Sequence, residues 1–349
     1  MAGTEKSSIL VEPHYGYAAA DGLPYKPTCA EAIREWLHVM NCVHNPQHSL
    51  TAINFLFQIG VGVAFIIFMT RFLSLDSFLF MLLVVLVFGT GYNTVWYHRY
   101  CSDLAFRFSH LTFAKIFLWT NPLAFIFREE IYAIPHKIHH QRTDKPGDPY
   151  GPHLGYLVNL LSPELTQRIN PNISREEFRA RQRTILHIGL HSHSYEQFRR
   201  TASIENVYYY AARIIVTQFI WISLTSALGG HALVLAYYSA IFITTILIRD
   251  FNWRGHGGNV QVVKRNNWEF DKKTRALNQY FYGFIASEWH DNHHHYITSA
   301  NNGFLASQID IAFIMIQALH RLGIIKSYIN AETLFRKQCL LSHNEARAE

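Results

Sequence analysis

Two short stretches of this chain are dense in histidine. Residues 136–140 read HKIHH, and residues 290–295 read HDNHHH. Residues at positions i, i+3 and i+4 of a helix share one face, so three histidines of each stretch can point to one place: His136, His139 and His140, and His290, His293 and His294. Neutral imidazole is the commonest metal ligand among side chains. Because six imidazoles exceed what one tetrahedral zinc site uses, the stretches predict two metal ions, or one ion with many nitrogen ligands.

Two further elements place polar groups at the ends of long apolar runs. YHRYCSD (97–103) contains His98 and Asp103, and NWRGH (252–256) contains Asn252 and His256. An ionisable residue at the end of a membrane segment indicates a functional site. Other histidines are interpreted as having no metal-binding role: His295 as a neighbour of the ligands, and the isolated His44, His153 and His231.

The composition is that of a membrane protein. Hydrophobic residues make up 49% of the 349 residues and charged residues only 16%, whereas about a quarter of a soluble domain is charged. Four runs have about the 20 residues that a membrane helix needs, and short connectors pair them into two hairpins: 51–70 with 77–96, and 207–228 with 231–249. A shorter run at 111–127 contains Lys115 and Pro122, which favours a re-entrant or interfacial helix. Buried helices of a large soluble protein are the alternative, but such long apolar runs are uncommon in soluble cores.

The charge distribution predicts the topology. The net charge is +6, and basic residues gather in 128–205 and 250–349, which should therefore be cytoplasmic. We expect an all-α integral membrane fold with a frayed cytoplasmic segment over 1–48 and one membrane domain over 49–349, whose helical cytoplasmic cap carries the histidines. The basic residues are spread among apolar runs, which argues against nucleic-acid binding. Four scattered cysteines form no CxxC pair, which argues against a disulfide scaffold or a zinc ribbon.

The arrangement resembles the membrane fatty acid desaturase superfamily of non-haem di-iron enzymes, over about residues 50–325. That family carries the boxes HxxxxH, HxxHH and HxxHH, and a further histidine in an NxxxH element after the last span. Here HKIHH with its trailing QRTDKPGDPY, SEWHDNHHH and NWRGH are similar to three of these elements. The resemblance implies two iron ions, O₂ as co-substrate, and these metal ligands: His98, Asp103, His136, His139, His140, His256, His290, His293 and His294.

The first box departs from the family pattern, because HRYCSD has Asp103 where the family has histidine. Three interpretations stay open. Asp103 is a ligand, as carboxylates are in other di-iron sites; or it lies behind the ligands and leaves one metal an open position; or it marks an inactive variant.

Other polar residues are candidates to support the ligands. A ligating histidine usually donates its second N–H to a carboxylate or a carbonyl, so Asp144 and Asp148 are candidates for this role, and Asn252 is a candidate to hold a metal-bound water. Further carboxylates near the boxes are Glu129, Glu130, Glu288 and Asp291.

The resemblance implies O₂-dependent oxidation of a fatty acyl chain that reaches the site from membrane lipid. Desaturation is favoured; oxidative decarboxylation of a free fatty acid to a terminal alkene and hydroxylation are alternatives, because a fold does not fix a function. No fused haem or iron–sulfur domain is recognisable, which implies a ferredoxin, rubredoxin or cytochrome donor with an NAD(P)H-dependent reductase. The N-terminus has no signal-peptide pattern, and a bacterial inner membrane is favoured over the endoplasmic reticulum. A divalent-metal transporter is the non-enzyme alternative, but transport sites lie near the bilayer midplane, whereas these histidines gather at one membrane edge.

Overall fold

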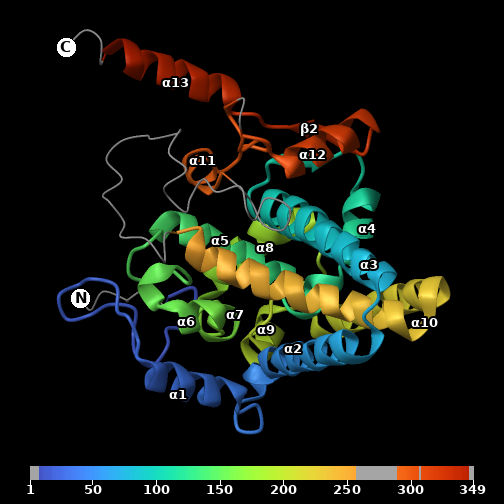
Figure 1. The fold of residues 1–349 in the computed structure, drawn as a ribbon. Helices are drawn as coiled ribbons and strands as arrows, with labels where there is room; N and C mark the ends of the chain where they lie inside the picture. Colours follow the sequence, from blue (N-terminus) through green and yellow to red (C-terminus); the bar gives the residue numbers. More distant parts are fainter. Residues whose placement is uncertain (1–7, 257–288, 306–307, 346–349) are drawn as a thin grey trace.

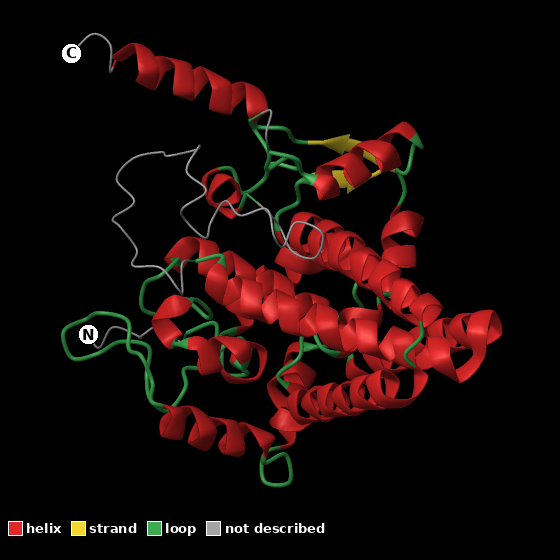
Figure 2. Cartoon of the chain, viewed as in Figure 1, coloured by secondary structure: helices red, strands yellow, loops and turns green. Residues whose placement is uncertain are grey.

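The computed structural model describes residues 8–256, 289–305 and 308–345, and this part of the chain is mostly helical (Figures 1 and 2). The α-helices are α1 (Cys29–Met40), α2 (Ser49–Ile67), α3 (Leu75–Leu86), α4 (Leu111–Thr120), α5 (Glu129–Arg142), α6 (Tyr156–Leu160), α7 (Ser162–Leu165), α8 (Arg175–Ile185), α9 (Tyr195–Thr201), α10 (Val207–Arg254), α11 (His290–His295), α12 (Ile311–Arg321) and α13 (Glu332–Glu345). A π-helix, η3 (Val87–Ser102), continues α3.

Within residues 8–256, 289–305 and 308–345, three continuous helical segments are long and apolar enough to cross a membrane. They span Pro46–Phe72, Leu75–Ser102 and Val207–Arg254, with mean hydropathies of 2.2, 2.0 and 1.9 over their most apolar windows. About 20 residues of helix are enough to cross the hydrocarbon layer of a bilayer. The chain therefore has the helices of a membrane protein, as its composition predicts.

The third of these segments, α10, reverses direction at two glycines. Gly229 and Gly230 have non-helical backbone angles, and Gly230 combines φ 61° with ψ −149°, a conformation that essentially only glycine adopts. The rings of Trp221 and Tyr237 stack with their centroids 5.6 Å apart, whereas a straight helix would separate these positions by about 24 Å. The two arms of α10 therefore pack against each other, and they correspond to the predicted helices 207–228 and 231–249. The number of membrane crossings remains a prediction.

The shorter apolar run at 111–127 divides into two pieces. Its first part is the ten-residue helix α4, and a 3₁₀ turn follows over Pro122–Phe125. The side chain of Asn121 accepts a hydrogen bond from the backbone N–H of Leu123 (3.1 Å) and starts this turn. A helix of this length is too short to cross a bilayer.

The expectation of an all-α chain is wrong in one detail. Strands β1 (Phe106–Phe108) and β2 (Ile325–Tyr328) form an antiparallel two-stranded sheet. Phe106 of β1 and Ile325 of β2 are both buried. The sheet joins the segment after the first histidine box to the C-terminal part of the chain, a long-range pairing that short local patterns do not reveal.

The N-terminal segment is folded rather than frayed over residues 8–48. Helix α1 places Ala32 against the buried residues Leu154, Val158 and Leu165. Glu35 accepts from Arg168 (3.2 Å), and the backbone of Val11 bonds to that of Arg168. This segment therefore packs against 128–205, the first of the two stretches predicted to form the cap.

Candidate metal centre

The first two histidine elements face each other across a helix contact. The π-helix η3 packs against α5, and every residue from Phe88 to Ser102 is buried. A π-helix is rare and often marks a functional site. This packing sets His98 and Asp103, at the end of η3, beside the histidines of α5: the rings of His98 and His136 lie 4.6 Å apart.

The third element, α11, is a short helix held by one hydrogen bond just before its start and another within its first turn. Trp289, which precedes it, adopts a left-handed conformation with φ 56°, and its indole N–H donates to the carbonyl of Ile309 (3.0 Å). The side-chain amide of Asn292 donates to the carbonyl of Asn302 (2.7 Å). These bonds point the α11 histidines at α5, where the rings of His140 and His293 lie 4.6 Å apart.

All nine residues expected as metal ligands come together, in two groups. Within each group, the potential ligand atoms lie within 4.8 Å of one another, so each group could hold a metal ion. The first group contains His98, Asp103, His136, His140 and His293. The second group contains His139, His256, His290 and His294.

The two histidine helices divide their ligands in the same way. In α5, His136 and its i+4 neighbour His140 belong to the first group, and His139 belongs to the second. In α11, the i and i+4 histidines belong to the second group, and His293 belongs to the first. Successive residues of a helix are turned by about 100°, so positions i and i+4 differ by about 40° whereas i+3 and i+4 differ by about 100°. Each helix therefore reaches both groups.

The spacing of the nitrogen atoms fits metal ligation. Nε2 of His140 lies 3.0 Å from Nε2 of His136 and 2.9 Å from Nε2 of His293. In the second group, Nε2 of His290 lies 2.8 Å from that of His256 and 3.0 Å from that of His294. A metal–nitrogen bond of about 2.1 Å places two ligands at right angles about 3 Å apart.

Several buried ligand atoms have no hydrogen-bond partner among the described residues. They are both carboxylate oxygens of Asp103, Nδ1 of His98 and Nε2 of His139. A buried polar atom without a partner costs roughly 1–3 kcal/mol. A cation at each group would satisfy these atoms, so the donor set fits two metal ions.

Burial also keeps the imidazoles in the form that binds metal. Burial is the largest cause that lowers the pKa of His136, His293 and His294 well below the usual value, and it lowers that of His140 to about 3. Neutral imidazole is the ligating form. Burial raises the pKa of the Asp103 carboxyl, and a bound cation would favour its ionised form instead.

Two residues outside the groups hold the α5 histidines in place. Nδ1 of His139 lies 2.7 Å from Oδ1 of Asp148, as predicted for a supporting carboxylate. Asp148 also accepts from the backbone N–H groups of Asp144 (2.8 Å) and Tyr150 (3.2 Å), which shapes the loop around it. Nδ1 of His136 bonds to the hydroxyl of Tyr150 (2.5 Å). The role of Tyr150 was not predicted, although this residue lies only two positions after Asp148.

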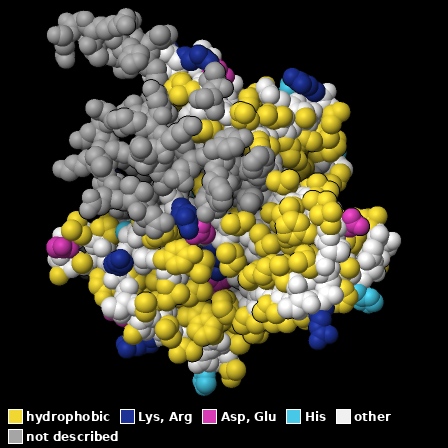
Figure 3. Space-filling view, in the orientation of Figure 1, with side chains coloured by type: hydrophobic (Ala, Val, Ile, Leu, Met, Phe, Trp, Pro, Cys, Tyr) yellow, Lys and Arg dark blue, Asp and Glu magenta, His cyan; other side chains and the backbone are white. Residues whose placement is uncertain are grey.

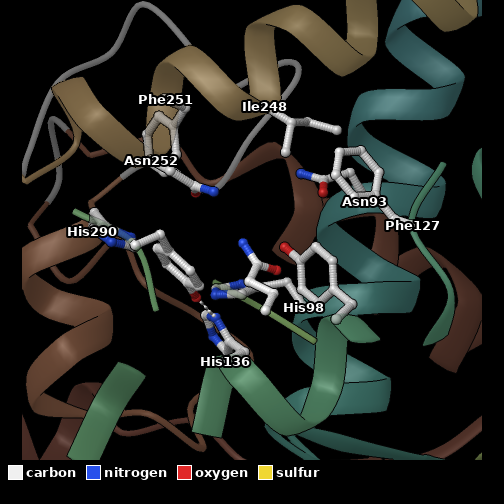
Figure 4. Close-up of a pocket in the computed structure, with 11 residues that line it drawn as sticks. Asn93, His98, Phe127, His136, Ile248, Phe251, Asn252 and His290 are labelled. Carbon is white, nitrogen blue, oxygen red and sulfur yellow. Dashed lines mark hydrogen bonds between the residues drawn. The ribbon is translucent and has the colours of Figure 1, made fainter. Parts of the chain in front are cut away.

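The remaining predicted support lies nearby, at longer range. Oδ1 of Asp144 lies 3.8 Å from Nδ1 of His256, beyond hydrogen-bond distance. Asp144 and Asp148 also form a third group with His153, a histidine to which the sequence analysis gave no role. Asn252 lines a cavity of about 30 Å³ (Figure 4), shared with side chains that include Asn93, His98, His136 and His290. That volume admits a water molecule, and the water-holding role of Asn252 stays a prediction.

Two carboxylates near the second box serve a different purpose. Glu129 accepts from Arg213 (2.7 Å) and Asn121 (2.9 Å), and Glu130 accepts from Arg128 (2.7 Å). Both lie in the first turn of α5, where they join buried ion pairs and do not contact the histidines. The suggestion that they support the ligands is therefore wrong. Glu288 and the side chain of Asp291 lie outside the described residues.

No protein-family model matches this chain, and no curated protein matches it in sequence.

Proposed function

We propose that this chain is an integral membrane oxidase with two non-haem iron ions, which uses O₂ to oxidise a fatty acyl chain. The observation that carries the proposal is the division of nine histidine and aspartate side chains into two adjacent groups of ligand spacing. Imidazole and carboxylate donors suit iron. When bound, iron at such a centre supplies the activation of O₂.

The arrangement of the helices supports a substrate from the membrane. We propose four crossings, formed by the first two apolar segments and the two arms of α10, in a bacterial inner membrane with the centre on the cytoplasmic side. His98 lies near the end of the Leu75–Ser102 segment, and Asn252 lies near the end of α10. An acyl chain lying between the helices could therefore reach the metal groups without leaving apolar surroundings.

The cavity beside the centre gives this chain's residues their roles. Phe127, Ile248 and Phe251 line it together with His98, His136 and His290 (Figure 4). The apolar side chains would exclude bulk water and hold a methylene group against the ligand groups. Asp148 and Tyr150 would keep the α5 imidazoles in one orientation while the substrate binds.

Desaturation is the proposed outcome, and terminal-alkene formation and hydroxylation are outcomes of the same test. Membranes containing the protein would receive a saturated fatty acid, O₂, NADPH, ferredoxin and its reductase, and the products would be read by gas chromatography with mass spectrometry. An unsaturated acid of unchanged carbon count supports desaturation. An alkene one carbon shorter would instead indicate oxidative decarboxylation. A hydroxy acid would indicate hydroxylation.

Matched variants tie the products to the centre. His139→Ala removes a ligand of the second group and His293→Ala one of the first, so both should lose product and iron while still inserting into membranes. His231→Ala, at an exposed histidine of α10, should change neither. Full activity in either ligand variant, or an iron-loaded protein that forms none of these products, would overturn the proposal. Rapidly exchanging zinc would favour a transporter.

A further inference from the structure

The solvent exposure of the second apolar segment, Leu75–Ser102, changes after Val87. Before this point, Leu79, Leu83 and Val87 are 53%, 58% and 43% exposed, whereas every residue from Phe88 to Ser102 is buried. Several elements cover the buried half: α5, α10 and α12 pack against it, and α4 contacts it through Tyr92. Helix α12 packs against η3 (Figure 1), and the rings of Phe117 in α4 and Trp96 in η3 stack with their centroids 5.7 Å apart.

Individual contacts show how closely α4 and α12 pack against this buried half of the segment. Gly91 lies against Met315 of α12, whose terminal methyl would be 3.6 Å from a Cβ placed on that glycine. The hydroxyl of Tyr92 donates to Thr120 at the end of α4 (2.8 Å). Gly91 and Tyr92 lie inside a segment long and apolar enough to cross a membrane. Helices that pack there lie beside the segment itself, not beyond its end.

Helix α12 is apolar on the side that faces away from the protein as well. Ala312, Phe313 and Ile316 are buried against the core. On the opposite side, Ile314 is 54% exposed, Leu322 is 73% exposed, and Ala318 is exposed between them. Spacings of four residues place these three on one stripe. The polar residues of α12 are Gln317, His320 and Arg321. An apolar stripe on a helix is normally covered, yet in the described part of the chain this stripe is open.

The open stripe belongs to a larger apolar surface. Leu111 and Ile116 of α4 are 49% and 52% exposed, and Ile309, just before α12, is 49% exposed. Figure 3 shows hydrophobic side chains spread over this side of the molecule, from the region of α10 to that of α12. Lys115 and Arg321 are the exposed basic residues of these two helices. Long basic side chains can reach the lipid headgroups from an apolar surface.

We propose that α12, together with α4, lies in the bilayer beside the second apolar segment, with lipid acyl chains covering Ile314, Ala318 and Leu322. The surface is continuous with the exposed face of α3, which selects lipid as the occupant. The inference rests on the membrane placement in the proposed function. It also revises the expectation that all of 250–349 lies in the cytoplasm, because α12 then belongs to the membrane.

The start of α12 connects this lipid contact to the metal centre. Asp310 caps the helix by accepting from the backbone N–H of Phe313 (2.9 Å), and it pairs with Arg99 (2.7 Å), the residue after His98. The carbonyl of Ile309 accepts from Trp289, the residue before His290. The position of α12 in the membrane therefore helps to place the first and third histidine elements.

Fluorescence quenching by lipids tests the membrane contact. In a full-length chain whose Cys29, Cys42 and Cys339 are replaced by serine, Ile314→Cys and Leu322→Cys would each be labelled with bimane. The purified proteins would then be placed in vesicles with or without lipids brominated in their acyl chains. Leu83→Cys is the matched membrane position, and Glu176→Cys, exposed on α8, is the aqueous position.

We expect brominated lipid to reduce the fluorescence at Ile314→Cys and Leu322→Cys as much as at Leu83→Cys, and to leave Glu176→Cys unchanged. If the α12 labels are not quenched while Leu83→Cys is, the placement of α12 in the bilayer is overturned but the proposed function is not. Water, another part of the chain or a second copy would then cover α12. An unquenched Leu83→Cys would instead overturn the membrane placement in the proposed function.

A charge-removing variant tests the connection to the centre. Asp310→Asn keeps the size of the cap and loses the ion pair with Arg99, so iron per chain should fall while the α12 labels stay quenched. Asp76→Asn, at an exposed acid in the first turn of α3, should keep its iron. Unchanged iron in Asp310→Asn would show that α12 does not position the ligands.

Discussion

Oδ1 of Asp103 lies 3.6 Å from Nε2 of His136, inside the first ligand group and with no hydrogen-bond partner for either carboxylate oxygen among the described residues. This position favours the interpretation of Asp103 as a metal ligand over that of a residue behind the ligands. It stands where the sequence pattern of the resembled family has histidine.

If the centre holds the two proposed iron ions, Asp103→Ala should lower the iron content by about half, because one ion would lose a ligand and binding follows the donor set. Asp103→His should keep both ions, since imidazole replaces carboxylate at the same place. Iron per purified chain, measured by mass spectrometry of the metal, checks both variants against Asp21→Ala at an exposed acid. Full iron in Asp103→Ala would place the carboxylate outside the ligand set.

Tyr150→Phe should weaken metal binding without removing a ligand. The hydroxyl of Tyr150 bonds to Nδ1 of His136 and fixes the imidazole so that Nε2 faces the first group. Losing such a supporting partner typically costs 10–100-fold in metal affinity. Competition with a chelator would measure the affinity, with Tyr156→Phe on the surface of α6 as the control. Equal affinities in the two variants would show that Tyr150 does not orient His136.

Arg213, a fully buried arginine of α10, should be essential for stability. Arg213 donates to Glu129 (2.7 Å) and to Glu205 (3.1 Å), and all three side chains are fully buried. Arg213→Leu leaves two buried carboxylates without their partner, which should cost roughly 3–5 kcal/mol. Thermal unfolding in detergent would reveal this loss as a lower midpoint. Because Glu129 begins α5, the variant should also lose iron.

An exposed ion pair provides the comparison for Arg213. Arg175 and Glu196 also form an ion pair, but their side chains are 56% and 61% exposed. Breaking a surface pair costs about 0–1 kcal/mol, so Arg175→Leu should unfold nearly as the unchanged chain does. Similar midpoints for Arg213→Leu and Arg175→Leu would contradict the role given to the buried pairs.

The metal-free chain should lose stability in acid, beginning near pH 6.5. Burial lowers the pKa of His140 from 6.5 to about 3. Between these values the unfolded chain binds a proton at this residue and the folded chain does not, so falling pH favours unfolding. His140→Gln removes one such group, and its unfolding temperature should fall less steeply below pH 6.5. His231→Gln should retain the original slope, and a slope unchanged by His140→Gln would contradict the burial argument.

Local rules made much of the site predictable. The i, i+3 and i+4 spacings of HKIHH and HDNHHH depend only on helical geometry, and the structure places those six histidines in the two groups. The lengths of the apolar runs predicted the membrane-length helices, and two adjacent glycines marked the reversal of α10. Residue type and spacing were sufficient for these features because each is decided within one segment.

Contacts between distant segments decided the rest. Whether His139 shares a group with its helix neighbours depends on where α11 and the end of α10 approach α5. Glu129 and Glu130 contact arginines and not histidines, because the first turn of α5 packs toward α10 and the loop before it. Tyr150 and Asp310 gained their roles in the same way. The sequence by itself determined which residue types could bind metal and cross a membrane. Only the tertiary structure decided which of them meet, because packing brings together residues whose separation along the chain no local rule can span.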